Sequence, residues 1–204
     1  MSLDETHAAR RGEDHAVSQA LRDAELLAAY AAGDAGAART LVEVQAPRAL
    51  ALARRMLGSE PEAEEVAQEA MLRLWRIAPK WRAGEAQIST WLYRVTANLC
   101  TDRLRRTRTQ TLPEGHDPAD ESPDAAARLM QSDRADALSA ALQKLPERQR
   151  LAVVLRHLEE RSNPEIAGIM DLTVDAVESL QARGRRRLSD LLAARRRALS
   201  YKDD

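Results

Sequence analysis

The chain has 204 residues, a formal net charge of −1 and an apolar share of 44%, values that fit a folded protein with one large or two small domains. Phenylalanine is absent and aromatic residues make up only 3%, so any core is small and aliphatic, and the composition predicts a mostly α-helical fold. Cys100 is the only cysteine, which excludes an internal disulfide and fits the cytoplasmic location that we expect. No apolar run approaches membrane-spanning length, and the N-terminal residues lack the apolar core of a signal peptide.

Apolar residues spaced three or four apart predict four helices in the first half of the chain, at about 21–32, 37–57, 60–77 and 88–106. Pro47 predicts a kink or an early break in the second of these helices. Ser59 and Glu62 form a capping-box pattern at the start of the third. Residues 79–87 predict a loop that exposes Trp81.

An acidic, proline-containing stretch separates this half from a second group of helical patterns. The sequence therefore predicts an all-α protein of two small helical domains joined by a flexible linker. Its expected parts are an N-terminal arm at 1–20, a first domain at 21–108, the linker at 109–133, a second domain at 134–194 and a tail at 195–204.

Residues 164–188 have the pattern of a helix-turn-helix. A short helix that contains Ile166 is followed by a tight joint at 171–173 and by a second helix with several arginines. We expect Asn163 to cap the first helix, with Pro164 at its first position. The second helix of this motif lies in the DNA major groove, where arginine contacts phosphates or base edges. A plain helical hairpin with a solvated basic end is the alternative.

The helix at 88–106 has a second face, a stripe of phosphate and base-edge donors at Arg94, Asn98, Thr101, Arg105 and Arg108. The preceding loop adds Lys80, Trp81 and Arg82. An aromatic ring among cations is typical of a pocket for a single strand or a flipped base. A solvated amphipathic face is the alternative.

Carboxylates crowd the first half of the 60–77 helix, but no histidine joins them, and the helix dipole favours acidic residues in a first turn. A protein-docking face with Gln68, Leu72 and Trp75 is therefore the better interpretation. The four histidines follow no metal-ligand spacing, and no catalytic or phosphate-binding motif occurs. We expect no enzymatic activity, no metal and no cofactor.

Three segments, EAEEVAQEAMLRLWRIAPKW, ISTWLYRVTANLCTDRLRR and LPERQRLAVVLRHLEERSNPEIAG, resemble bacterial sigma factors of the extracytoplasmic-function group. The similarity covers about residues 24–106 and 135–192, in the family's order and spacing. It implies a non-catalytic subunit that directs core RNA polymerase to promoters and that is inhibited by an anti-sigma factor. The linker is similar to the family's connector, which enters the polymerase cleft.

The resemblance also implies roles for individual residues. Docking on the clamp helices of the largest polymerase subunit is implied for Gln68, Glu69, Leu72 and Trp75. Melting and recognition of the minus-ten element are implied for Lys80, Trp81, Arg94, Asn98, Asp102, Arg103 and Arg105. Recognition of the minus-thirty-five element, on a domain that also contacts the polymerase flap, is implied for Thr173, Ser179, Arg183, Arg185 and Arg186.

The chain departs from the family at a few positions. Asp171 stands at the helix-turn-helix joint, where many members have glycine. Aspartate tolerates the left-handed backbone geometry of such a joint better than most other residues, so we expect the turn to form. Glu178 and Leu180 replace basic residues of many members, so the promoter sequence stays open. The alternative functions are a stand-alone helix-turn-helix regulator and a decoy that sequesters an anti-sigma factor.

Overall fold

The computed structural model describes residues 21–82, 87–110 and 126–200, and every regular element within these ranges is helical. The all-α prediction is therefore confirmed. None of the helices in the described ranges is long and apolar enough to cross a membrane. After a helix at 21–31, the elements are α2 (Ala35–Leu57), α3 (Glu60–Ile77), the short 3-10 helix η1 (Ala78–Lys80), α4 (Ile88–Gln110), α5 (Ala126–Gln143), α6 (Glu147–His157), α7 (Asn163–Met170) and α8 (Val174–Ser200).

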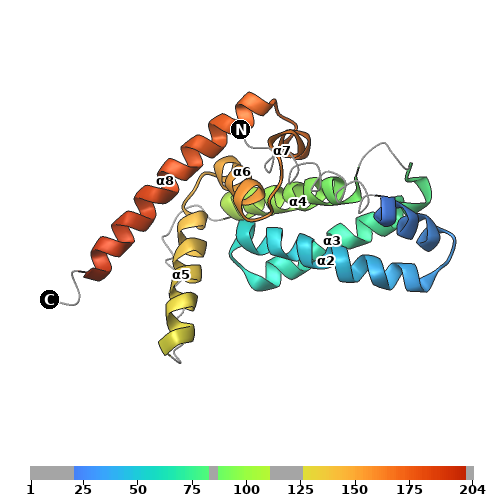
Figure 1. Ribbon diagram of the computed structural model, residues 1–204, viewed down its shortest axis with the longest axis horizontal. Helices are drawn as coiled ribbons and strands as arrows, with labels where there is room; N and C mark the ends of the chain where they lie inside the picture. Colours follow the sequence, from blue (N-terminus) through green and yellow to red (C-terminus); the bar gives the residue numbers. More distant parts are fainter. Residues whose placement is uncertain (1–20, 83–86, 111–125, 201–204) are drawn as a thin grey trace, which may run out of the picture.

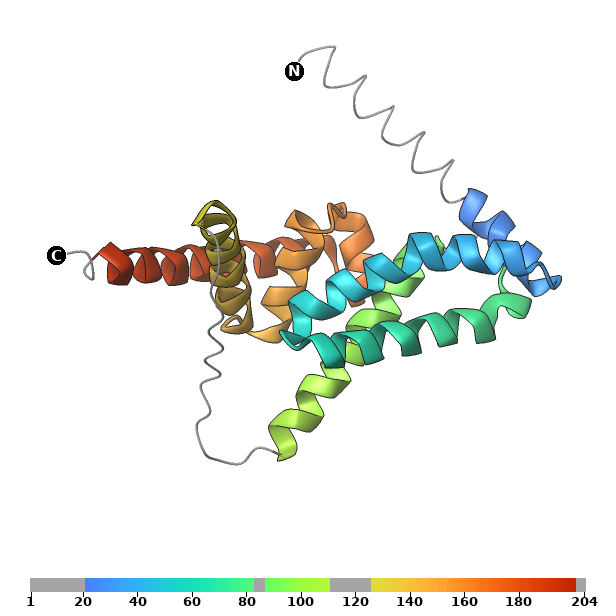
Figure 2. The same cartoon turned by 90° about the horizontal axis from the view of Figure 1, so that it is seen from below.

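The helices up to α4, here called the N-terminal unit, pack around a core of their own. Helices α2 and α3 lie side by side, and α4 packs across both (Figures 1 and 2). The α2–α3 turn needs Gly58, whose φ of 70° is left-handed and which ends α2. The core is aliphatic, as the composition predicted, and its fully buried side chains include Leu27, Leu41, Leu74, Ile88 and Leu92.

Helices α5 to α8, here called the C-terminal unit, contain the predicted helix-turn-helix in α7 and α8. Their arrangement places α6 against α8, while the C-terminal end of α8 projects beyond the rest of the fold (Figures 1 and 2). The capping residue of α7 is Ser162 and not Asn163 as predicted. Ser162 accepts from the backbone N–H of Glu165, whose carboxylate accepts in turn from the Ser162 N–H at 2.8 Å. This reciprocal pair satisfies two backbone groups, which a cap at Asn163 would not do.

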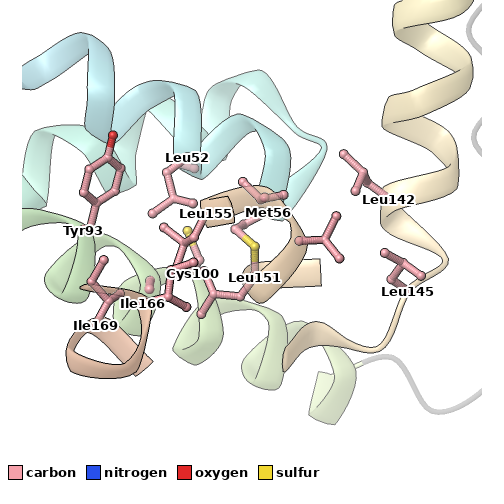
Figure 3. Packing of buried hydrophobic residues seen from close by; sticks show 14 of the residues in the cluster. Leu52, Met56, Tyr93, Cys100, Leu142, Leu145, Leu151, Leu155, Ile166 and Ile169 are labelled. Atoms are coloured by element: carbon pink, nitrogen blue, oxygen red, sulfur yellow. The ribbon is translucent and has the colours of Figure 1, made fainter. Parts of the chain in front are cut away.

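The two units share a second hydrophobic core (Figure 3). Met56 of α2 and Cys100 of α4 pack in one buried cluster with Leu145, Leu155 and Ile166 of the C-terminal unit. Each of these side chains is at most 3% exposed. Apolar burial contributes about 25 cal/mol per Å² removed from water, so a shared core of this kind holds the units together.

Polar contacts at the end of α2 reinforce this junction. The last carbonyl groups of a helix have no partner within it. Here Gln143 Nε2 donates to the Arg55 carbonyl at 3.1 Å, and the buried Arg150 guanidinium donates to the Met56 carbonyl. The C-terminal unit therefore caps a helix of the N-terminal unit, and burial lowers the pKa of Arg150.

Two local predictions need correction. Helix α2 continues through Pro47 without the early break that was one of the two predicted outcomes, because this residue is exposed and water can satisfy the carbonyl that proline leaves unpaired. Ser59 is the N-cap of α3, but its side chain makes no capping hydrogen bond, so the predicted capping box does not form. At the two ends of the predicted linker, α4 ends at Gln110 and α5 begins at Ala126. The arm at 1–20 and linker residues 111–125 lie outside the described residues.

Candidate functional site

The joint of the helix-turn-helix forms at Asp171, which has a φ of 54° in the left-handed region. Its backbone N–H donates to the Ala167 carbonyl and closes α7. The next turn starts at Thr173, whose hydroxyl oxygen accepts from the Ala176 N–H at 3.3 Å. Thr173 therefore caps the start of α8, a structural task that adds to the DNA contact predicted for it.

One face of α8 is packed and the other is open. Val177 is fully buried, and the backbone of Gly184 approaches α6 so closely that a Cβ there would lie 2.6 Å from Val153 Cγ2. The predicted DNA-contact residues lie away from this packed face and are exposed: Ser179, Arg183, Arg185 and Arg186. The Arg183 Nε group donates to the Ser179 carbonyl at 3.2 Å, which directs this arginine along the helix surface.

The polar stripe of α4 faces outward at Arg94, Asn98 and Arg105, whereas Thr101 is half-buried and the Arg108 side chain lies outside the described residues. Arg94 and Asn98 are exposed, and Lys80 is exposed at the end of η1. The sequence predicted an exposed Trp81, but the structure shows this side chain half-buried. Its ring packs edge-on against Trp91, with the ring centroids 6.0 Å apart. Its Nε1–H group is buried and has no hydrogen-bond partner among the described residues. The two indoles therefore form an aromatic wall beside the stripe.

The basic end of α4 is engaged in ion pairs. Arg103 lies 3.3 Å from Glu62 and also pairs with Glu65, both on α3, while Arg105 pairs with Asp102 one turn away. All of these groups are at least one-third exposed. Exposed pairs of this kind contribute only about 0–1 kcal/mol, so a phosphate group can replace the carboxylates at little cost.

An apolar groove runs between α2 and α3 on the outer face of the N-terminal unit. Among its lining residues, Val42 is 42% exposed and Leu72 is 48% exposed, which is unusual for large apolar side chains. Gln68 and Trp75 line the same groove, and the Trp75 ring packs on Tyr30 with centroids 4.4 Å apart.

Glu69 lies outside this groove. Its carboxylate accepts from Arg73 Nε at 2.9 Å and lines a different, mixed-charge depression with Arg103. The hydrogen bond from Arg73 lowers the pKa of Glu69. The structure therefore brings Gln68, Leu72 and Trp75 together but separates Glu69 from them.

The α2 half of the groove was missed by the sequence analysis. Val42, Ala46 and Leu50 line it and recur every fourth residue, which is the spacing of one helix face. This pattern was visible in the sequence, next to the buried positions of the same helix.

A polar cluster between the two units was also missed. The Glu159 carboxylate is buried, accepts from the Tyr93 hydroxyl at 2.8 Å and pairs with Arg55. The Arg161 guanidinium lies over the Tyr93 ring, 5.6 Å from its centroid. Burial, followed by the nearby Glu159 charge, raises the pKa of Tyr93, so its hydroxyl stays protonated and donates. No local pattern in the sequence connects residues so far apart along the chain.

Comparison with known proteins agrees with this geometry. Residues 41–110 match the family model for Sigma-70 region 2, and residues 135–188 match that for Sigma-70, region 4. The chain is 36% identical over 170 residues to the ECF RNA polymerase sigma factor SigM of Mycobacterium tuberculosis, which covers 83% of this chain and 84% of the relative. It is 28% identical to the ECF RNA polymerase sigma factor SigW of Bacillus subtilis, over 76% of this chain and 89% of the relative.

Solved structures show the same relationship. The structure of CnrH in complex with the cytosolic domain of CnrY is similar with a TM-score of 0.62 and 29% identity, over 85% of this chain and 98% of that one. The sigma factor RpoE of Bartonella quintana, solved with the anti-sigma factor NepR, is similar in fold with a TM-score of 0.61 at 19% identity, over 76% of this chain and 96% of that one. Two matched regions in the family's order, on a fold with the family's architecture, show that this chain belongs to the ECF group of the sigma-70 family.

Proposed function

We propose that the chain is an alternative sigma factor that binds core RNA polymerase, directs it to a set of promoters, melts the minus-ten element and recognises the minus-thirty-five element. One observation supports this role best. A single chain presents three separate outward surfaces: the arginine face of α8, the polar stripe of α4 and the apolar groove between α2 and α3. A stand-alone helix-turn-helix regulator would need only the first of them.

In the minus-thirty-five role, α8 enters the major groove. Its arginines, Arg183, Arg185 and Arg186, provide contacts to phosphates and guanine edges, and Ser179 lies among them. Because phosphate contacts release counterions, binding should weaken steeply with salt.

In the minus-ten role, Arg94 and Asn98 contact the unpaired strand, and the Trp81–Trp91 wall stacks an extruded base. Stacking on an aromatic side chain contributes about 1–3 kcal/mol per base, which offsets part of the cost of unpairing. Lys80 lies at the end of η1 and Asp102 and Arg105 lie farther along α4, whereas Arg103 points toward α3, where it pairs with Glu62 and Glu65. In the proposed complex the two arginines exchange their carboxylate partners for phosphates.

In the docking role, the α2–α3 groove receives the clamp helices of the largest polymerase subunit, while the C-terminal unit contacts the flap. Leu72 and Trp75 supply the apolar centre of the contact, with Gln68 beside them. Glu43 and Glu64 line the same groove and favour a partner helix with basic residues at its edge. An amphipathic helix in an apolar groove is a common recognition mode.

The two units must separate for one molecule to occupy both promoter elements. Elements centred at minus ten and minus thirty-five lie about 25 base pairs apart, or about 85 Å at 3.4 Å per pair. In this structure the units share one core, so their DNA faces belong to a single packed body. The 15 residues from 111 to 125 can span at most about 50 Å, and α5 adds about 27 Å. Together these lengths give about 77 Å, so the dimensions of the two units must supply the rest of the distance.

We also propose an anti-sigma protein as the regulator. Two solved relatives are complexed with another protein, the cytosolic domain of CnrY in one case and the anti-sigma factor NepR in the other. In this chain the exposed apolar groove is the surface that such an inhibitor would cover, in competition with polymerase.

The test is transcription in vitro with core polymerase and a library of genomic fragments. We expect transcripts that start at a common promoter sequence, and their complete absence would disprove the proposal. Leu72→Ala should weaken core binding by about tenfold or more, since removing a central apolar anchor costs over 1 kcal/mol. Leu21→Ala is the matched control, because Leu21 is 60% exposed but lies outside the groove lining.

A further inference from the structure

One acidic side chain lies among the DNA-contact residues of α8. Glu178 is exposed and precedes Ser179, in the first half of a helix that starts at Val174. The N-terminal residues of a recognition helix are those that contact base edges. A carboxylate at this place repels the phosphate backbone, so it contributes to binding only if it meets a hydrogen-bond donor.

The Glu178 carboxylate is held in place by a chain of hydrogen bonds between α7 and α8. Gln181 is only 7% exposed and donates from Nε2 to Asn163 Oδ1 at 3.0 Å. With its oxygen occupied, the Asn163 amide turns its nitrogen toward Glu178, and Nδ2 donates to Glu178 Oε1 at 3.0 Å. Among the described residues, Glu178 Oε2 has no protein partner, so one oxygen is anchored and the other can accept a new bond.

The chemistry of base edges selects the ligand of such a group. An ionised carboxylate can only accept hydrogen bonds. In the major groove guanine presents two acceptors and thymine an acceptor and a methyl group, whereas adenine places the N7 acceptor next to its amino group. Cytosine presents its N4 amino group alone, which makes it the base that a carboxylate contacts best.

We infer that Glu178 recognises one cytosine of the minus-thirty-five element and that Asn163 and Gln181 are positioning residues for its carboxylate. The inference rests on the proposed function, which brings α8 into the major groove. It adds a base preference that the arginines alone do not provide, because arginine favours guanine.

The test uses holoenzyme assembled from core polymerase and the full chain, with promoters randomised over the minus-thirty-five element. Transcripts are sequenced to give a base preference at each position. The wild-type protein should prefer cytosine at one position by about 5- to 150-fold, the discrimination of a good side-chain–base contact. Glu178→Gln keeps an acceptor for Asn163 but replaces the other oxygen with a donor, so the cytosine preference should disappear at that position alone.

Two further variants separate recognition from general effects. Asn163→Ala should weaken the same preference without abolishing it, because the carboxylate is still present but no longer anchored. Asp175→Asn removes another exposed carboxylate of α8 and should leave the cytosine preference unchanged. Glu178→Gln should also bind non-specific duplex more tightly than the wild type, because it removes a repulsive charge.

An unchanged base profile in Glu178→Gln would overturn the inference, and so would an equal loss of transcription on every sequence. If the wild-type holoenzyme selects a promoter sequence but the variant selects the same one, only the inference fails. If the wild-type protein gives no transcripts at all, the proposed function fails and the inference with it.

Discussion

The junction between the two units predicts a variant that is less stable yet binds polymerase more tightly. Tyr93→Phe removes the hydroxyl that donates to the buried Glu159 carboxylate at 2.8 Å. The Glu159 side chain is 7% exposed, so water cannot readily replace the lost donor. A hydrogen bond to a charged group contributes about 1.5–3 kcal/mol, and the closed arrangement should lose about that much.

The expected consequence is a shift between closed and open forms by about 10- to 150-fold, since 1.4 kcal/mol corresponds to a factor of ten. If only the open form binds core polymerase, its apparent dissociation constant falls in proportion to the gain in open population, until the open form dominates. Urea unfolding should show the loss of stability, small-angle X-ray scattering the larger mean radius, and a titration with labelled core polymerase the tighter binding.

Tyr30→Phe is the matched control for this experiment. The Tyr30 ring packs on Trp75, but within the described part of the chain its hydroxyl makes no hydrogen bond. Tyr30→Phe should therefore change neither the free energy of unfolding nor the mean radius of the protein. A double-mutant cycle of Tyr93→Phe with Glu159→Gln should give a coupling free energy above about 0.5 kcal/mol in magnitude. The effects of mutations at independent sites usually add to within about that amount. Additive effects, or a Tyr93→Phe protein that is less stable but binds polymerase no better, would refute the reasoning.

Three further predictions concern stability and reactivity. Gly184→Ala should destabilise the protein by about 1–3 kcal/mol, because its Cβ would lie 2.6 Å from Val153 Cγ2, whereas Gly168→Ala, with no atom within 4 Å, should stabilise it by about 0.5–1 kcal/mol; thermal melting of both checks this. Cys100 should resist iodoacetamide in the native protein and react after denaturation, because it is fully buried and burial raises its pKa to about 12; labelling at equal rates would contradict this. Burial acts to raise the pKa of Glu165, but hydrogen bonds from Ser162 and the charge of Arg161 outweigh it, so the folded pKa lies below the ordinary value of 4.5. The contribution of Glu165 to the free energy of unfolding is therefore present above pH 4.5 and is lost as the pH falls through the folded pKa. Unfolding of Glu165→Gln, measured as a function of pH, should lack this loss of stability in acid.

Much of the fold follows from local patterns in the sequence. The limits of α3, Glu60–Ile77, match the predicted helix because an apolar stripe, a proline in the first turn and clustered first-turn acids act together. The helix-turn-helix was equally predictable, although Asp171 replaces glycine at its joint. The errors occurred where two local rules competed. At α7 both Ser162 and Asn163 are good caps, and the reciprocal bond with Glu165 selects Ser162.

The candidate surfaces were predictable in part, for a physical reason. A helical period identifies which residues share a face, but it does not say what that face packs against. Trp81 was expected to be exposed because it falls in a predicted loop, yet Trp91 lies close enough to cover one side of its ring. Glu69 was grouped with Gln68, although adjacent residues point about 100° apart on a helix and only Gln68 faces the groove.

The junction between the units was the least predictable feature, and the same logic explains why. Cys100 and Leu145 have the spacing of ordinary core residues, and each could bury itself within its own unit. Nothing in a single helix period distinguishes an internal core from a shared one. The distinction comes from the charged groups: Glu159 is buried only because Tyr93 and Arg55 of the other unit provide its partners. Burying a carboxylate without such partners would cost several kcal/mol of folding free energy. The closed arrangement therefore depends on the hydrogen bond and ion pair of Glu159, and opening the junction returns these polar groups to water. The junction is therefore more readily reversible than an apolar core of the same size, as the proposed opening on polymerase requires.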